Sequence, residues 1–409
     1  METIGIIAEY NPFHRGHAHQ LSYLAKHWPK AVRIVVMSGS FVQRGGPALF
    51  SKFDRARWAI LGGADVVIEL PTLWASANAE AFADGGVRLL AGLGVECLSF
   101  GSEITDLDLL KQTASLNQEE DVQKRIKDLL KEGLFYGAAL RQAMVESLPQ
   151  ASKILESPNA MLGVEYLRTI KAYGLTMIPL PVERQSNHHA HQLTEALPSG
   201  TALRAELLRN SAKSKHQTSI LSALSPYFPQ KVFPLINQAL QEGRYAQPER
   251  YQEYIHYRGR IEEIDTLQNL QDFTEGLEHK WMKAMQANTW AQAREQIKSK
   301  RYSYARLDRM AANTVLGITK GLYQEGQKQG PNYARLLAFN QRGRNWLRSY
   351  RGTLPIIQKW APFFKKASGF TKASLRLDQK ATDIQALAMA HTNHHRGGLD
   401  YTMPPIYLP

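Results

Sequence analysis

Short apolar runs alternate with longer amphipathic stretches along the first half of the chain. Continuous runs that are rich in β-branched residues predict strands covered by helices on both faces. The runs are TIGIIA at 3–8, VRIVVM at 32–37, DVVIEL at 65–70, ECLSF at 96–100 and a fifth at 175–179. The stretches with helical spacing between them are 15–26, 51–61 and 75–93. Strands and helices that alternate in this way are typical of an α/β fold with a parallel sheet.

Ligands of such folds bind at the carboxyl ends of the parallel strands. The segments that follow the first four predicted strands are therefore candidate binding loops. These segments are residues 9–17, 38–47, 71–78 and 101–105.

The second half of the chain has a different pattern. From about residue 216 the strand-like runs fade, and apolar residues recur at spacings of three and four, which predicts amphipathic helices. The predicted helices are 220–224, 232–240, 261–270 and 273–285. We therefore expect an α/β domain over residues 1–215 and a mainly α-helical region over residues 216–409.

Charge divides the chain near the same place. Residues 1–200 carry 19 basic and 21 acidic side chains, whereas residues 201–409 carry 31 basic and 16 acidic ones, a net charge of +15. The last 109 residues alone have a net charge of +12. So localised an excess favours a polyanionic partner over an ordinary solvated surface. We expect a catalytic first half and a second half that meets the polyanion.

Composition excludes several classes of protein. With 44% hydrophobic and 21% charged residues, the 409-residue chain is not intrinsically disordered. Cys97 is the only cysteine, which excludes an intramolecular disulfide and a cysteine-based metal centre. No apolar run approaches the roughly 18–20 residues that span a bilayer, and the N-terminus lacks the features of a signal peptide. We expect a cytoplasmic protein that does not enter a membrane.

The first candidate loop carries the strongest chemical signal. His14 and His17 bracket Gly16 where the chain leaves a buried strand and enters a helix. Side chains three positions apart on the first turn of a helix lie on the same side. The helix N-terminus adds free N–H groups and a partial positive charge, so the two histidines can contact phosphate oxygens. The alternative is a pair of surface or metal-binding histidines.

Thr201 and Arg204 form a second candidate anion site in the segment SGTALR at 199–204. A hydroxyl at the start of a helix and an arginine one turn later can hold an anion together. The alternative is a plain helix cap.

The segment NPFHRGH at 11–17 resembles the signature of the HxGH nucleotidyltransferase superfamily, which includes class I aminoacyl-tRNA synthetases and pantetheine-phosphate adenylyltransferases. The resemblance implies a Rossmann-like fold that binds ATP, directs attack on its α-phosphate and releases pyrophosphate. The 199–204 segment resembles the second signature of that superfamily, which clamps the leaving pyrophosphate. The catalytic residues that the resemblance implies are His14, His17, Thr201 and Arg204.

A more specific resemblance rests on several motifs in order. They are MSGSFVQRGGPA at 37–48, SK at 51–52, DVVIELP at 65–71, FGSE at 100–103, PN at 158–159 and, more weakly, RYSYARL at 301–307. Together they are similar to the bacterial tRNA(Met) cytidine acetate ligase family. That family converts acetate and ATP to acetyl-adenylate and transfers the acetyl group to N4 of the wobble cytidine of elongator tRNA(Met).

This second resemblance also implies an ATP cradle, with Mg²⁺ expected to accompany the nucleotide. The implied ATP-binding residues are Ile7, Ala8, Glu9, Tyr10, Asn11, Pro12, Phe13, His14, Arg15, Gly16, His17, Ala18, His19, Gln20, Gly101, Asn159 and Arg184. The sequence departs from the family at Gln20, where a third histidine is usual, and any role of that histidine is in doubt here.

Simpler interpretations of three of these positions stay open. Gly101 suits an ordinary tight turn, Asn159 suits a helix cap, and Arg184 suits the protein surface. Arg44 and Lys52 lie in loop-side positions from which they could meet phosphate or tRNA. Two histidine clusters, at 188–191 and 391–395, lack acidic or cysteine companions at ligand spacing, so we expect polar loops and no metal site.

Basic and aromatic residues interleave in two segments of the second half, at 298–309 and 341–351. Arginine can pair with phosphates, and aromatic rings can stack on unpaired bases. The arginines expected to contact tRNA are Arg301, Arg306, Arg342, Arg344 and Arg348. For each aromatic residue taken singly, a place in a helical core is the favoured alternative.

Two other functions compete with an acetate ligase that modifies RNA. A small-molecule adenylyltransferase shares the HxGH signature but does not need so basic a second half. A non-catalytic RNA-binding protein needs none of the four catalytic residues together. The expected partners are therefore elongator tRNA(Met) and acetate, with no obligate protein partner.

Overall fold

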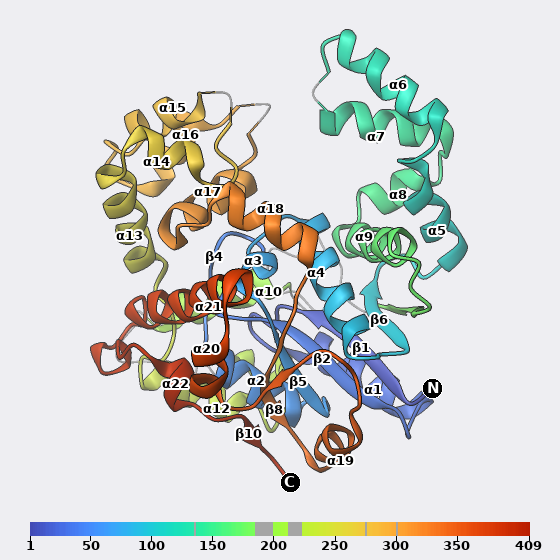
Figure 1. Cartoon of the computed structure of the whole chain (residues 1–409), viewed down its shortest axis with the longest axis vertical. Helices are drawn as coiled ribbons and strands as arrows, with labels where there is room; N and C mark the ends of the chain where they lie inside the picture. The colour runs from blue at the N-terminus through green and yellow to red at the C-terminus, as the bar shows by residue number, and fades with distance from the viewer. Residues whose placement is uncertain (135, 185–198, 212–222, 275, 300–301) are drawn as a thin grey trace.

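The predicted strands of the first half lie side by side in one sheet. A computed structural model describes residues 1–134, 136–184, 199–211, 223–274, 276–299 and 302–409. In it, neighbouring strands run β5–β2–β1–β6–β7 and all pair in parallel (Figure 1). Their bounds are β1 (Thr3–Ala8), β2 (Val32–Ser38), β5 (Val66–Leu70), β6 (Cys97–Ser102) and β7 (Ile178–Glu183). The α/β fold class with a mostly parallel sheet is confirmed.

The second half adds strands to the same sheet, which the helical pattern did not predict. β8 (Ala334–Phe339) pairs antiparallel with β5, and β9 (Ile356–Ile357) and β10 (Ile406–Tyr407) pair in parallel with β8. The signal was present, because ARLLAF in β8 is apolar at every position except Arg335, and nearly every residue is buried. The division at residue 215 stays a prediction, and both sides of it contribute to one sheet.

Alternation along β1 shows how the two faces of the sheet are covered. Ile4 and Ile6 pack on the side of α1 (Arg15–His27) and α2 (Lys52–Leu61). Ile7 packs on the opposite side, with α4 (Ala79–Gly92) and α9 (Pro158–Ala172). Side chains of a strand alternate between the faces, so one buried strand serves two hydrophobic layers.

The helix expected over 75–93 begins only at Ala79, and a separate short helix precedes it. α3 (Thr72–Ala75) ends before Asn78, whose side chain accepts a hydrogen bond of 2.9 Å from the Ala81 N–H. An asparagine that caps the first turn of a helix satisfies one of its free donors. The predicted helix at 51–61 begins with a cap as expected, since Ser51 accepts from the Asp54 N–H at 3.1 Å.

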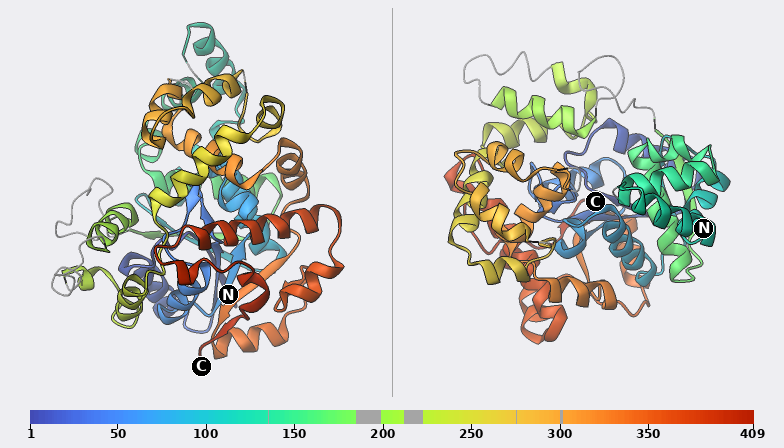
Figure 2. Two further views of the ribbon diagram at one scale, coloured as in Figure 1. Left: turned by 90° about the vertical axis from the view of Figure 1, so that its left-hand side faces the viewer. Right: turned by 90° about the horizontal axis from the view of Figure 1, so that it is seen from above.

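Two further groups of helices lie beyond the carboxyl edge of the sheet (Figures 1 and 2). The first group is α5 (Leu107–Leu116), α6 (Glu120–Lys131), α7 (Tyr136–Ser147) and α8 (Ala151–Leu155). The second is α13 (Pro248–Ile261), α14 (Ile264–Asn269), α15 (Leu277–Ala284), α16 (Trp290–Ile297), α17 (Tyr304–Leu316) and α18 (Lys320–Gln329). In the described part of the chain, no helix has the length and apolar character needed to cross a membrane.

The remaining elements complete the flanks of the sheet. They are the hairpin β3 (Phe41–Val42) and β4 (Gly46–Pro47), then α10 (Gly200–Ser211), η1 (Ser225–Tyr227), α12 (Phe233–Gln241), α19 (Gln341–Ser349), α20 (Trp360–Lys366), α21 (Gly369–Leu387), η2 (Thr392–His394) and α22 (Leu399–Thr402).

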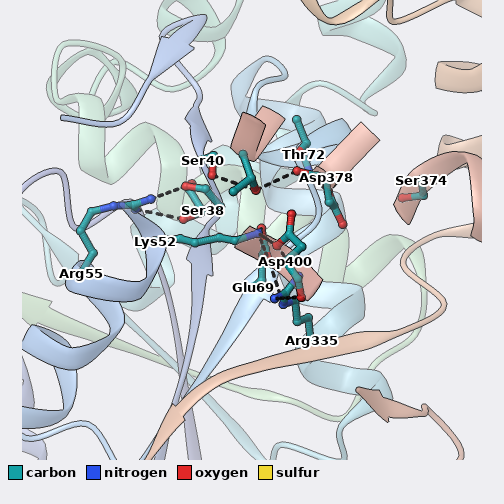
Figure 3. Close-up of polar contacts among 12 residues, drawn as sticks. Ser38, Ser40, Lys52, Arg55, Glu69, Thr72, Arg335, Ser374, Asp378 and Asp400 are labelled. Carbon is teal, nitrogen blue, oxygen red and sulfur yellow. Dashed lines mark hydrogen bonds and ion pairs between the residues drawn. The ribbon is translucent and has the colours of Figure 1, made fainter. Parts of the chain in front are cut away.

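A buried cluster of charged side chains joins the C-terminal segment to the first half (Figure 3). Lys52 Nζ lies 2.7 Å from Glu69 Oε1 and 2.8 Å from Asp400 Oδ1. Arg335 on β8 pairs with both carboxylates. The Lys52 side chain is 0% exposed, so it does not reach phosphate or tRNA as the sequence allowed. It acts as a structural cation between α2, β5 and α22.

Candidate active site

The loop after β1 is fixed by contacts with distant segments. Asn11 precedes a cis peptide bond to Pro12, and its side-chain oxygen accepts a 2.8 Å hydrogen bond from the Leu49 N–H. The preceding residue, Tyr10, has a positive φ of 47°. At these residues the chain turns from the end of β1 into the first turn of α1.

Both histidines of the HxGH motif hold the start of α1. His14 is the N-cap residue, and its Nδ1 accepts from the Gly16 N–H at 3.0 Å. The His14 N–H in turn donates to His17 Nδ1 at 3.3 Å. The two rings stack with their centroids 3.8 Å apart. A Cβ on Gly16 would lie 2.9 Å from His14 Cε1, so the glycine makes room for this arrangement.

These contacts assign the protonation of both rings. Burial, followed by the charges of Arg184 and Arg204, lowers the pKa of His14 to about 3. Burial, followed by His14 and Arg184, lowers the pKa of His17 well below its usual value. Neutral imidazoles that accept at Nδ1 carry their proton at Nε2. Each ring therefore keeps one donor for a ligand.

Arg204 connects the second motif to the first. Its Nη1 donates to the Asn11 carbonyl at 2.6 Å, and its Nη2 donates to Thr201 Oγ1 at 3.0 Å. Burial lowers the pKa of Arg204, and the charge of Glu9 opposes this shift. The predicted pair thus lies directly beside the HxGH loop. Ser199 caps the helix, because its Oγ accepts from the Ala202 N–H at 3.2 Å, so the helix-cap interpretation of this segment also holds.

Arg184 is a second arginine in the lining of the cavity. Arg184 follows β7, and its Nη1 lies 3.4 Å from Asn159 Oδ1. Asn159 donates to Glu103 Oε1 at 2.6 Å, and the Ala160 N–H donates to the other Glu103 oxygen at 2.9 Å. A Cβ on Gly101 would lie 3.2 Å from Arg184 Cγ, so the strand end leaves little space at this point.

One cavity of about 540 Å³ brings most of the predicted residues together. This volume lies within the range of about 300–1,000 Å³ that is usual for ligand sites. Its lining includes Ile7, Ala8, Glu9, Tyr10, Asn11, His14, His17, Gln20, Gly101, Asn159, Arg184, Thr201 and Arg204. The predicted cradle residues outside this lining are Pro12, Phe13, Arg15, Gly16, Ala18 and His19.

The residues outside the lining have other contacts. Phe13 is fully buried in the core, and Arg15 donates to the Pro226 carbonyl at 2.9 Å. Gln20, by contrast, lines the cavity; it stands where the related family has a third histidine, and it donates to Ser99 Oγ at 3.0 Å. A glutamine is therefore satisfied at this position by the neighbouring strand β6.

Arg55 is a structural residue that sequence reasoning missed. Its guanidinium is fully buried and donates to the carbonyls of Glu9 at 2.7 Å and Ser38 at 3.0 Å, and to that of Gly39 (Figure 3). Its Nε donates to the Phe50 carbonyl at 3.0 Å. One cation thus holds the loop after β1 against the loop after β2. An arginine in an amphipathic helix gives no sequence signal for such a role.

Three of the arginines expected to contact RNA lie far from the cavity along the sheet. The last residue of β8, Phe339, lies opposite Val66 at the start of β5. α19 therefore begins at the amino edge of the parallel strands, whereas the HxGH loop lies at their carboxyl edge (Figure 1). The arginines on α19 are Arg342, Arg344 and Arg348.

Two of the arginines expected to contact RNA, Arg342 and Arg306, have hydrogen-bond partners within the protein. Arg342 donates to two carbonyls of the segment before β2, at 2.8 and 3.2 Å, so it also docks α19 against the sheet. Arg306 on α17 donates to Thr274 Oγ1 at 3.1 Å. Arg301 lies outside the described residues, as does the histidine cluster at 188–191. Tyr302 is buried, as the helical-core alternative predicts.

Comparison with known proteins agrees with this geometry. The family model of the HIGH Nucleotidyl Transferase matches residues 1–399. The tRNA(Met) cytidine acetate ligase of Thermoanaerobacter sp. (strain X514) is 34% identical over the full length of both chains. That of Bacillus licheniformis is 32% identical over 94% of this chain and 92% of its own. The crystal structure of Thermotoga maritima TmcAL bound with alpha-thio ATP covers both chains fully, with 28% identity and a TM-score of 0.89. The chain belongs to the HIGH nucleotidyl transferase family and, within it, to the family of the tRNA(Met) cytidine acetate ligases.

Proposed function

We propose that this chain is an ATP-dependent ligase that activates acetate as acetyl-adenylate and transfers the acetyl group to N4 of the wobble cytidine of elongator tRNA(Met). The observation that carries the proposal is the convergence of His14, His17, Arg184 and Arg204 on one cavity. A neighbour of the same fold binds an ATP analogue, and the full-length relatives carry the name of this activity.

In this proposal, the triphosphate lies at the N-terminus of α1. His14 and His17 donate through Nε2 to its oxygens, and the helix dipole adds positive potential. Arg204, which Thr201 and the Asn11 carbonyl hold in place, faces the leaving pyrophosphate. Asn159 and Arg184 contact the nucleoside side of the ligand. The residues position the reactants and neutralise charge, which is the main requirement of phosphoryl chemistry.

Mg²⁺ is expected to enter with the nucleotide. In the part of the chain that the structure describes, no three histidine, cysteine, aspartate or glutamate side chains gather as metal ligands. Mg²⁺ commonly binds through substrate phosphates and waters with one or two carboxylates. The ion would neutralise part of the triphosphate charge.

Labelled acetate tests the proposed reaction directly. We expect incubation with ATP and methionine tRNA to place the label on N4 of one cytidine, because a site built to bind a triphosphate activates a free carboxylate. Mass spectrometry of the digested tRNA measures the label. Label that arrives only from acetyl-CoA, or pyrophosphate release that depends on a phosphorylated metabolite and not on acetate, would favour the small-molecule adenylyltransferase.

The arginines of α19 are proposed to bind tRNA away from the wobble nucleotide, since they lie at the opposite edge of the sheet. Replacing Arg344 and Arg348 with glutamine should weaken tRNA binding and reduce the slope of log K against log salt by about 0.7–0.9 per lost phosphate contact. Filter binding over a salt series measures the slope. Arg342 is left intact because it docks the helix. An unchanged slope places the RNA on another surface.

A further inference from the structure

Two side chains in the lining of the cavity have a hydrogen-bond donor without a partner among the described residues. Tyr166 on α9 is 1% exposed, and it packs edge-on against Phe100 with the ring centroids 5.7 Å apart. Its hydroxyl and the buried Nε2 of Gln43 have no hydrogen-bond partner among the described residues. Both residues line the cavity. A buried donor without a partner is unfavourable, and a ligand that enters the cavity could accept from it.

The lining of the cavity also contains the carboxylate of Glu9. Glu9, the first residue after β1, accepts a 3.0 Å hydrogen bond at Oε1 from the Gln43 N–H. It also lies close enough to Tyr166 that its charge, after burial itself, raises the pKa of the tyrosine. The Glu9 Oε2 atom takes part in no hydrogen bond or ion pair within the described part of the chain. Phe82 of α4 is a further aromatic residue in the lining of the cavity.

This set of groups matches the Watson–Crick edge of cytosine. That edge offers one donor, the N4 amine, and two acceptors, N3 and O2. Enzymes that act on a base take it out of its stack and read this edge inside a pocket with aromatic or apolar walls. Glu9 supplies the required acceptor, and Tyr166 and Gln43 supply the two donors.

We propose that Glu9, Tyr166 and Gln43 form the pocket for the target cytosine, with Glu9 as the residue that accepts the proton of the N4 amine. This assignment rests on the proposed function and adds to it the residues that select and activate the acceptor base. None of the three residues belongs to the HxGH or Ser-x-Thr-x-x-Arg motifs.

Acetate is a less suitable ligand than cytosine beside Glu9. A free carboxylate placed beside Glu9 would bring two like charges together in a partly buried site, which is unfavourable. The neutral base meets no such repulsion, and its amine can donate directly to Glu9.

The transfer step balances with these groups. The N4 nitrogen attacks the acyl carbon of acetyl-adenylate, a C–N bond forms, and the C–O bond to phosphate breaks with its electron pair leaving on AMP. The nitrogen becomes strongly acidic as it bonds to the acyl carbon, so a carboxylate is a sufficient base. The N4 proton passes to Glu9 and then to solvent. General bases of this kind contribute about 10²–10⁴-fold to rate.

The variants Glu9→Gln and Tyr166→Phe test the assignment. Glutamine keeps an acceptor for the Gln43 N–H but cannot take a proton, and phenylalanine removes only the hydroxyl. Each variant is measured in two assays, acetate-dependent ATP–pyrophosphate exchange and single-turnover transfer from synthetic acetyl-adenylate to methionine tRNA. The matched control is Tyr173→Phe at the end of the same helix, where the tyrosine is 48% exposed.

We expect transfer to fall further than exchange, by about 10²-fold or more for Glu9→Gln and about tenfold for Tyr166→Phe. Tyr173→Phe should behave as wild type in both assays. Equal losses in the two assays would overturn the assignment, since they would indicate a general structural role. A raised KM for acetate in exchange, with normal transfer from acetyl-adenylate, would also overturn it and assign the pocket to acetate.

The wild-type enzyme separates this inference from the proposed function. If the wild type forms adenylate but acetylates no tRNA, the proposed function fails and the cytosine pocket fails with it. If the wild type acetylates tRNA while both variants match it in transfer, only the cytosine pocket is wrong.

Discussion

Replacing His14 or His17 with alanine is expected to lower the rate of adenylate formation by about 10²–10³-fold, the usual cost of losing one preorganised donor to a developing charge. Both rings are neutral and present Nε2–H, because burial lowers their pKa and Nδ1 already accepts a backbone N–H. Acetate-dependent ATP–pyrophosphate exchange measures the loss. Binding of tRNA should change little, since neither side chain is proposed to contact it.

Two further variants separate chemistry from folding. His14 also caps α1, and loss of an N-cap costs about 0.5–2 kcal/mol of stability. His14→Asn restores a good capping residue without the imidazole, so it should fold like the wild type and still lose activity. His27→Ala, at the far end of the same helix, is the control and should keep full activity. Wild-type exchange by either active-site alanine variant would show that the phosphates bind elsewhere.

Replacing Lys52 with methionine is expected to lower the free energy of unfolding by about 3–5 kcal/mol. The side chain is 0% exposed and pairs with Glu69 and Asp400, so its removal leaves two buried carboxylates with Arg335 as the remaining cation of the cluster drawn in Figure 3. A buried charge without a partner is far more costly than the pair itself. Urea unfolding followed by circular dichroism measures the change.

Lys131→Met is the matched control for that experiment. Lys131 pairs with Asp128 on the surface of α6, and its side chain is 79% exposed. Surface substitutions of this kind usually change stability by no more than about 0.5 kcal/mol. If Lys52→Met cost as little as Lys131→Met, the buried cluster would not be what holds the C-terminal segment to α2 and β5.

The cluster also links the C-terminal part of the chain to the first half. Arg335 lies on β8 and Asp400 on α22, yet both pair with residues of the first half. β8 itself hydrogen-bonds to β5. The segment that follows residue 330 therefore completes the sheet that carries the site.

The sequence predicted the first four strands of the first half closely, whereas the fifth, expected over 175–179, is β7 at Ile178–Glu183. The close agreement has a simple reason. A strand that is covered on both faces must be apolar throughout, and that pattern is visible without any knowledge of its neighbours. The same reasoning could have found β8, whose ARLLAF run is apolar at most positions. The helical spacing on either side of this run favoured a helix there instead. No local feature of the sequence shows that β8 pairs antiparallel with β5, a strand some 270 residues earlier.

The candidate site divides in the same way. His14, Gly16 and His17 are recognisable from sequence because the chemistry of one loop and one helix start is local. Glu9 was included only as part of a continuous cradle, and Tyr166 and Gln43 were not singled out at all. Each is an ordinary residue in its own segment, and only packing shows that the Tyr166 hydroxyl and Gln43 Nε2 are buried without a hydrogen-bond partner among the described residues.

The sequence by itself thus determined where the strands of the first half occur along the chain, the HxGH turn and the basic character of the second half, because each depends on residues that are close together in the chain. Tertiary structure decided which distant residues meet. It placed Arg204 against the Asn11 carbonyl, buried Lys52 between two carboxylates and put the α19 arginines at the edge opposite the cavity. Such contacts depend on how helices and strands pack across the sheet, and no local pattern of apolar and polar residues encodes that choice.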